Sequence, residues 1–112
     1  MKKIEAIVRN NMLERIKDEL VKRGHTGMTV TEVRGFGRQR GQTEMYRGAE
    51  YKIDFVPKVL ITIVTSDDDA KVVADVIIKT AQTGKVGDGK IFISTLDEVI
   101  RIRTAETGQA AV

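Results

Sequence analysis

The sequence predicts an α+β domain with the ferredoxin-like βαββαβ plan, in which two helices cover one face of an antiparallel sheet. Three observations lead to this fold. Four short segments are rich in alternating apolar or β-branched residues, which is typical of strands. Two longer segments space their apolar residues as the buried face of a helix requires. These segments follow one another in the order strand, helix, strand, strand, helix, strand.

The first half of the chain supplies one helix between two strands. Residues 3–9 alternate apolar and polar side chains and predict a strand. Residues 12–22 predict a helix, and Gly24 suits its end because glycine adopts the left-handed conformation of a helix cap at little cost. Residues 28–36 are rich in Val and Thr and predict the second strand.

The second half repeats this pattern. Residues 56–64 form an almost continuous apolar run, which predicts the most buried strand. Ser66 can cap the helix that follows, and this helix should end before Gly84. Residues 91–95 predict the fourth strand and residues 99–103 a short alternating fifth. One face of the resulting sheet has no helix to cover it, so we expect a homo-oligomer that buries this face between subunits.

Length and composition exclude several classes of protein. The 112 residues suffice for one domain, spanning residues 1–112, with a single core. No apolar run approaches the ~18 residues of a membrane span, and no secretory segment is evident. Because the chain has no cysteine and one histidine, disulfides, thiolate metal sites and histidine metal clusters are excluded. We therefore expect a cytoplasmic protein.

Residues 83–90, TGKVGDGK, are the first candidate binding segment. They match the pattern G-x-x-x-x-G-K, but Ile91 stands where a Walker loop has Ser or Thr, and the loop leads from a helix into a strand. It is therefore not a Walker loop. The backbone N–H groups of three glycines can still surround an anion, and Lys90 adds a positive charge. The alternative is a plain helix end and turn, which explains Gly84 alone.

Residues 34–41, RGFGRQRG, match two known signatures only in part. The glycine spacing is one residue too long for a dinucleotide-binding fingerprint, and no helix follows. The opening Arg-Gly-Phe-Gly resembles an RNA-recognition signature, but charged and amide side chains then replace the aromatic ones that stack on bases. An RNA-binding module of ferredoxin-like topology stays as an alternative.

Residues 101–103, Arg-Ile-Arg, are the third candidate. On a strand, Arg101 and Arg103 would point the same way, about 6 to 7 Å apart, a spacing that suits adjacent phosphates. The alternative is an edge strand that carries charge against aggregation. A nucleotide-hydrolysing enzyme is a weaker possibility, because only Asp88 lies near this chemistry and nothing positions it against a water molecule.

Residues 37–55 are predicted to be a long connection, because they show no apolar period. This connection holds both tyrosines of the chain, within MYRGAEYK at 45–52. A long loop rich in Tyr and Arg is typical of a surface that binds partners.

These segments together resemble the PII nitrogen-regulatory signal proteins over nearly the whole chain. The resemblance rests on TGMTVTEVRGFGRQRG (26–41), TEMYRGAEY (43–51), TAQTGKVGDGKIF (80–92) and VIRIRT (99–104). It implies a compact homotrimer of ferredoxin-like subunits that is not an enzyme. It also implies a T-loop at about 37–55, a B-loop at about 82–90 and a C-loop at about 102–112.

The resemblance implies ligand sites in the clefts between subunits. ATP and ADP compete for each cleft, and 2-oxoglutarate joins only with Mg²⁺ and ATP. The implied nucleotide-binding residues are Thr29, Gly37, Arg38, Val64, Gly87, Asp88, Gly89 and Lys90, with Arg101 and Arg103 as a phosphate clamp from the adjacent subunit. The implied residues for 2-oxoglutarate are Gln39, which also binds Mg²⁺, Arg40, Gly41, Lys58 and Gly87.

The resemblance also implies partners, which the T-loop would bind in a conformation set by the ligands. One partner is the ammonium transporter, whose channel would receive Arg47. Another is a uridylyl- or adenylyltransferase that would modify Tyr51. The protein would also take part in the regulation of glutamine synthetase. No nucleic acid partner and no direct membrane insertion are implied, although the transporter would recruit the protein to the membrane. Departures from the family pattern are Asn10, Asn11, Ala49, Thr62 and Ala105.

Overall fold

The computed structural model describes residues 1–36, 43–46, 49–52 and 55–112. The elements are β1 (Lys2–Val8), the 3-10 helix η1 (Asn10–Met12), α1 (Leu13–Lys22), β2 (Thr29–Gly35), β3 (Thr43–Tyr46), β4 (Ala49–Lys52), β5 (Val56–Thr65), α2 (Asp67–Ala81), β6 (Lys90–Thr95) and the 3-10 helix η2 (Gly108–Ala111). No helix among these residues is long and apolar enough to cross a lipid bilayer.

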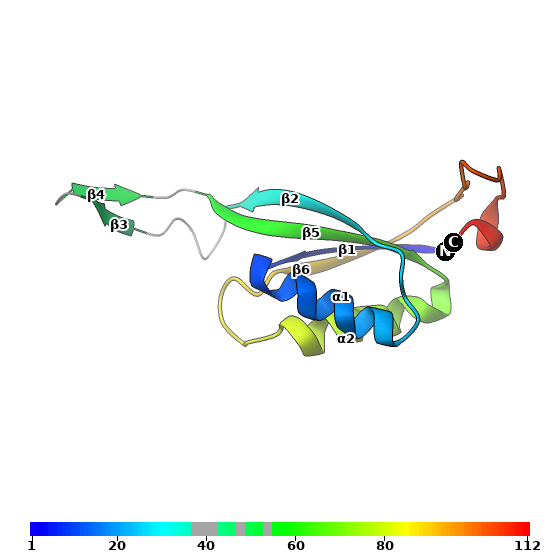
Figure 1. Ribbon diagram of the computed structural model, residues 1–112, viewed down its shortest axis with the longest axis horizontal. Coiled ribbons are helices and arrows are strands. Elements are labelled where there is room, and N and C mark those ends of the chain that lie inside the picture. Colours follow the sequence, from blue (N-terminus) through cyan, green and yellow to red (C-terminus); the bar gives the residue numbers. More distant parts are fainter. Residues whose placement is uncertain (37–42, 47–48, 53–54) are drawn as a thin grey trace.

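The main sheet has four strands in the order β2-β5-β1-β6, and every neighbouring pair is antiparallel. Both helices lie against one face of this sheet, as Figure 1 shows. The predicted α+β fold of the ferredoxin-like type is therefore confirmed. Ser66 caps α2 as predicted, because its hydroxyl oxygen accepts a hydrogen bond from the backbone N–H of Asp69 at 3.2 Å.

The core lies between the helices and the sheet. Alternate residues of the two central strands point toward the helices, since successive side chains of a strand face opposite sides. The largest fully buried side chains are Ile4, Ile16, Leu20, Ile61, Val73 and Ile77. Helical apolar spacing predicts the members of this set that lie on α1 and α2, because each helix turns one stripe of residues toward the sheet.

The other face of the main sheet has no helix over it (Figure 1). On β5 the residues of this face, Leu60, Thr62 and Val64, are half-buried, and Phe92 of β6 is 51% exposed. A sheet face with apolar side chains and no cover within the chain is a surface on which another molecule can pack. This is the uncovered face that the sequence predicts.

The predicted fifth strand at 99–103 is wrong. Only Ile100 forms a bridge, to Thr107, and a turn follows it. The backbone N–H of Arg101 donates to the carbonyl oxygen of Glu106 at 2.9 Å, and that of Ala105 donates to Arg101 at 2.8 Å. The main sheet offers no neighbour here, because β6 ends at Thr95 opposite Lys2, the first residue of β1. The 6 to 7 Å strand spacing of Arg101 and Arg103 therefore does not apply.

Part of the predicted long connection at 37–55 forms a hairpin, which the sequence does not predict. Residues of β3 and β4 pair as an antiparallel hairpin, with Thr43 opposite Lys52 and Tyr46 opposite Ala49. Each strand has four residues, which is too short for an alternating pattern to stand out in the sequence. Residues 37–42, 47–48 and 53–54 lie outside the described residues.

Candidate functional site

The loop between α2 and β6 is the centre of the candidate site. Gly84, Gly87 and Gly89 adopt φ angles of 83°, 105° and 107°, which residues other than glycine rarely adopt. Gly89 has a second constraint, since a Cβ atom there would lie 1.7 Å from the backbone oxygen of Ile7. Gly89 is therefore needed where the loop passes closely over the end of β1.

The carboxylate of Asp88 holds this loop together. It accepts hydrogen bonds from the backbone N–H of Thr83 at 2.8 Å, from the hydroxyl of Thr83 at 2.5 Å and from the backbone N–H of Gly84 at 2.8 Å. These bonds, those from Thr83 first, hold the pKa of Asp88 well below its usual range. The side chain of Asp88 is thus bound by the loop itself.

Arg9 follows the last residue of β1 and contacts the same loop. Its guanidinium group donates to the carboxylate of Asp88, and it also donates to the carbonyl oxygen of Val86 at 2.9 Å. A third contact reaches the hydroxyl oxygen of Thr83 at 3.4 Å. Sequence reasoning missed Arg9, because a single arginine after a strand belongs to no motif; only the fold brings it to a loop 79 residues away.

Lys58 supports the loop from β5. Its side chain is buried, and its ammonium group donates to the carbonyl oxygen of Gly87 at 2.7 Å. Burial lowers the pKa of Lys58, as does the nearby charge of Arg9, while the carboxylate of Asp88 acts in the opposite direction. Two cations and one carboxylate therefore lie together under the loop, and the balance of charge favours an anion.

The backbone of the loop offers hydrogen-bond donors to such an anion. Within the part of the chain that the structure describes, no acceptor contacts the backbone N–H groups of Val86 and Gly87. Consecutive free N–H groups in a glycine-rich turn are a common anion-binding arrangement.

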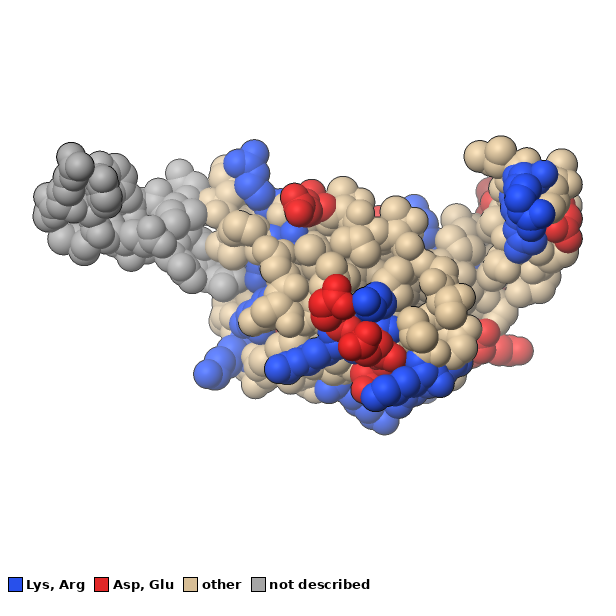
Figure 2. Space-filling view, in the orientation of Figure 1, with Lys and Arg blue, Asp and Glu red and all other residues tan. Residues whose placement is uncertain are grey.

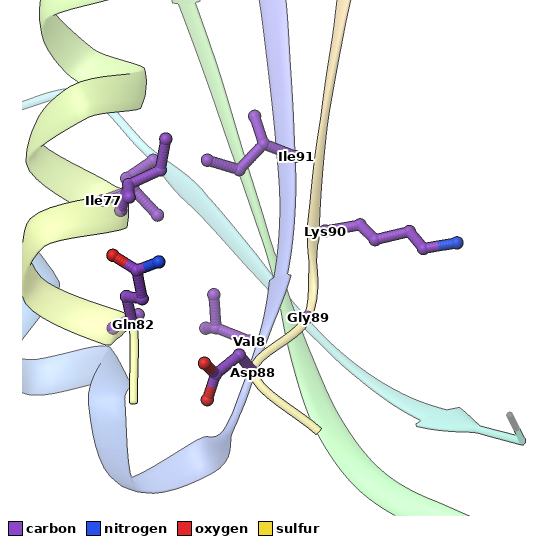
Figure 3. Close-up of a pocket in the computed structure, with 9 residues that line it drawn as sticks. Val8, Ile77, Gln82, Asp88, Gly89, Lys90 and Ile91 are labelled. Carbon is purple, nitrogen blue, oxygen red and sulfur yellow. The ribbon is translucent and has the colours of Figure 1, made fainter. Parts of the chain in front are cut away.

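Figure 3 shows how Asp88 and Lys90 lie relative to the cavity beside the loop. A cavity of ≈ 270 Å³ opens on the helix side, and apolar side chains such as Val8, Ile77 and Ile91 line much of it. Lys90 points away from this cavity, because it pairs with Ile7 on the uncovered face of the sheet. Lys90 therefore adds its charge on the uncovered face, whereas Asp88 lines the cavity on the helix side.

A second cavity, of ≈ 470 Å³, lies beside Lys58 and is lined by Asn10, Glu32, Val33, Arg34, Pro57 and Lys58. It adjoins the position where the chain leaves β2. Here the rings of Phe36 and Phe55 lie 5.9 Å apart, and the guanidinium carbon of Arg34 lies 5.9 Å from the centre of the Phe55 ring. Lys58 thus contacts the loop and also lines a space large enough for a small carboxylate.

The remaining predicted site residues lie elsewhere in the chain. Thr29 begins β2, opposite Thr62, and Val64 lies six residues after Lys58 on β5, about 20 Å away along the strand. Arg101 and Arg103 belong to the segment near the C-terminus, which lies at the opposite end of the main sheet from residues 82–89 (Figure 1). The Arg101 guanidinium pairs with the carboxylate of Glu106 at 3.1 Å.

Several predicted residues lie outside the described ones, namely Gly37, Arg38, Gln39, Arg40, Gly41 and Arg47. Tyr51 is in β4, where its backbone pairs opposite Glu44. The structure therefore brings together Lys58 and the segment from Gly87 to Lys90, and it separates both from Arg101 and Arg103.

Charge on the helix face does not favour the nucleic-acid alternative. Figure 2 shows basic and acidic side chains intermixed over α1 and α2 in this view. Glu19, for example, pairs with Lys22 and Arg23. Nucleic-acid binding calls for a continuous basic surface, and this face of the described residues does not present one.

Comparisons with known proteins identify the family. The family model described as "Nitrogen regulatory protein P-II" matches residues 1–106. The chain is 58% identical to "Nitrogen regulatory protein P-II" of Klebsiella oxytoca and to "Nitrogen regulatory protein P-II 1" of Escherichia coli K12, and 55% identical to "Nitrogen regulatory protein P-II" of Rhizobium meliloti. Each match covers 100% of both chains. Proteins of this family are signalling proteins rather than enzymes. The chain belongs to the nitrogen regulatory protein P-II family.

Proposed function

We propose that this protein senses ATP and ADP, together with 2-oxoglutarate, at sites shared between neighbouring subunits of a homotrimer. The observation that carries the proposal is the division of the candidate site between two ends of one chain. The loop between α2 and β6 lies at one end of the main sheet, and the segment after β6 that contains Arg101 lies at the other (Figure 1). One chain cannot close such a site, but two adjacent chains can.

The loop is suited to bind the phosphates of a nucleotide. The free N–H groups of Val86 and Gly87 and the ammonium group of Lys90 are donors of the kind that phosphate oxygens accept. Arg101 and Arg103 of the adjacent subunit add charge from the other side, and Gly37, Arg38, Thr29 and Val64 complete the proposed nucleotide site.

A contact between different ends of identical chains must repeat around a ring to close. Three subunits are the smallest such ring above a dimer, and each would bury its uncovered sheet face toward the centre. The apolar residues on that face, such as Leu60 and Phe92, support this arrangement.

We propose that 2-oxoglutarate binds beside the loop, with Mg²⁺ and ATP. The buried ammonium group of Lys58 suits one carboxylate, and the cavity that it lines has room for a small dicarboxylate. Gln39 supplies an amide oxygen of the kind that Mg²⁺ accepts, and Arg40, Gly41 and Gly87 complete this proposed site.

The proposed output is docking of the T-loop, residues about 37–55, on proteins of nitrogen metabolism in the cytoplasm. Arg47 would enter an ammonium transporter at the membrane. Tyr51 would be the site of modification by a uridylyl- or adenylyltransferase, and modified and unmodified forms would differ in the regulation of glutamine synthetase. A bulky anionic group on Tyr51 would obstruct docking by its size and charge.

Mixing two defective variants tests whether the nucleotide site is shared. Lys90→Ala removes a charge from the loop side, and Arg101→Ala removes one from the other side. Each homotrimer alone should bind ATP weakly. Subunit exchange between the two should restore some sites. In these sites the Arg101→Ala subunit supplies the intact loop and the Lys90→Ala subunit supplies the intact arginine pair. About a quarter of the sites in a random mixture are of this kind.

Calorimetry of the exchanged mixture, with native mass spectrometry to count subunits, measures the outcome. Recovery of tight ATP sites at about that fraction supports the proposal. If the mixture binds no better than its components, although masses show mixed trimers, the site is not shared between subunits.

A further inference from the structure

We propose that Arg9 and Asp88 are positioning residues for the phosphate-binding loop, residues 82–90. Asp88 acts through the loop backbone and not as a ligand of the nucleotide. This inference rests on the proposed function, because nucleotide binding is one of its measurements.

The contacts of Asp88 leave its carboxylate no freedom to serve a ligand. One oxygen accepts from the backbone N–H groups of Thr83 and Gly84, each at 2.8 Å. The other accepts from the Thr83 hydroxyl at 2.5 Å and from Arg9. Such a carboxylate fixes the start of the loop relative to its end, as a capping residue fixes the first turn of a helix.

Arg9 has two effects on this carboxylate. A lone negative charge next to Gly87 would repel phosphate, and the guanidinium group offsets that charge. The same group donates to the carbonyl oxygen of Val86, so the peptide between Val86 and Gly87 is oriented with its carbonyl toward Arg9. Because a trans peptide points its N–H opposite its carbonyl, the Gly87 N–H faces away from Arg9.

The ion pair between Arg9 and Asp88 joins the loop to the main sheet. Arg9 follows β1, which lies between β5 and β6 in the main sheet. The side chains of Arg9 and Asp88 are both 22% exposed, so solvent weakens their ion pair less than at an open surface. The loop is thereby held in one conformation before any ligand arrives, and the cost of ordering it on binding is avoided.

Removal of this ion pair should reduce the fraction of molecules whose loop is ready to bind. Apparent affinity falls in proportion to that fraction, so a loop that is ready one-tenth of the time binds roughly tenfold more weakly. Lysine at position 9 keeps the positive charge but lacks the planar guanidinium group with its several N–H donors. It therefore cannot donate to both Asp88 and Val86 with the same geometry.

The experiment compares Arg9→Met, Arg9→Lys and Asp88→Asn with the unchanged protein. Arg15→Met is the matched control, since Arg15 is exposed on α1 and has no hydrogen bond or ion pair with described residues. Two quantities are measured: the Kd for ATP by calorimetry in magnesium-free buffer, and the amide hydrogen exchange rates of Thr83 and Gly84 without nucleotide.

We expect roughly tenfold weaker ATP binding for Arg9→Met and Asp88→Asn, an intermediate loss for Arg9→Lys, and no change for Arg15→Met. Exchange at Thr83 and Gly84 should be faster in Arg9→Met, while amides of β1 and β5 keep their protection. This second readout separates positioning of the loop from a general loss of stability.

Two outcomes would overturn the inference. One is unchanged exchange at Thr83 and Gly84 in Arg9→Met. The other is unchanged ATP affinity in a variant whose loop amides do exchange faster. Failure of the unchanged protein to bind ATP would count against the proposed function instead, and the exchange rates would still test whether Arg9 positions the loop.

Discussion

The ammonium nitrogen of Lys58 lies 2.7 Å from the carbonyl oxygen of Gly87, so a buried cation of β5 supports the loop that leads into β6. The same side chain lines the cavity of ≈ 470 Å³ beside β2. One residue therefore touches both the proposed nucleotide loop and the proposed 2-oxoglutarate site. If both ligands bind as proposed, Lys58 is a contact through which occupancy of one site would affect the other.

Replacement of Lys58 by methionine should abolish the pairing with a ligand carboxylate while keeping much of the side chain's volume. We expect binding of 2-oxoglutarate, in the presence of Mg²⁺ and ATP, to weaken by at least about tenfold, since hydrogen bonds to charged groups contribute about 1.5 to 3 kcal/mol. Calorimetry measures this. Lys79→Met, at an exposed position of α2, is the control and should bind normally. Equal affinities in the two variants would rule out Lys58 as the carboxylate partner.

Replacement of Gly89 by alanine should destabilise the protein and its loop together. The added Cβ would meet the backbone oxygen of Ile7, and the φ angle of 107° is unfavourable for alanine. We expect a loss of about 2 to 4 kcal/mol in the free energy of unfolding, measured with urea. Gly27→Ala is the control, because open space surrounds that position and its φ is not positive. If both variants lost the same stability, the close approach of the loop to β1 would not be real.

The contribution of Asp88 to stability should depend on pH. An unfolded aspartate titrates near pH 3.9, and the folded pKa of Asp88 is lower. Its contribution is therefore complete above the unfolded value and is lost as pH falls from about 4 toward the folded pKa. The difference in unfolding free energy between the unchanged protein and Asp88→Asn should be smaller at about pH 2.5 than at about pH 6. A difference that stayed constant would mean that the carboxylate is not held in its ionised form.

Replacement of Ala105 by glycine should strengthen the turn near the C-terminus. Ala105 has a φ of 59°, and a residue with a Cβ pays about 1 kcal/mol for that conformation. We expect slower amide exchange at Arg101, whose N–H donates to Glu106 across this turn. Ala110→Gly, in η2, is the control and should bring no such gain. Faster exchange at Arg101 in Ala105→Gly would show that the strain is absent.

Local patterns in the sequence predict both helices and the four strands of the main sheet. The spacing of Val73 and Ile77 predicts the buried face of α2, and Ser66 predicts its start, because both effects act within a few residues. Glycine and lysine in the segment from Gly84 to Lys90 predict an anion site, and this stays a prediction.

The sequence alone does not predict which residues far apart in the chain contact each other. Alternation at 99–103 predicts a strand, but a strand needs a neighbour, and β1 begins at Lys2, already opposite Thr95. Arg9 and Asp88 meet only because β1 and β6 pair in register, which no local pattern states. The family resemblance implies that Asp88 belongs to the nucleotide site, but no local pattern predicts that its carboxylate binds Thr83 and Gly84.

The dependence of 2-oxoglutarate binding on nucleotide tests the central proposal most directly. Binding of 2-oxoglutarate should be measured by calorimetry under three conditions: without Mg²⁺ or ATP, with Mg²⁺ only, and with both Mg²⁺ and ATP. We predict that ATP binds in magnesium-free buffer and that 2-oxoglutarate binds only when both Mg²⁺ and ATP are present. Tight binding of 2-oxoglutarate without nucleotide would contradict the proposal that this protein senses the two ligands at one shared site.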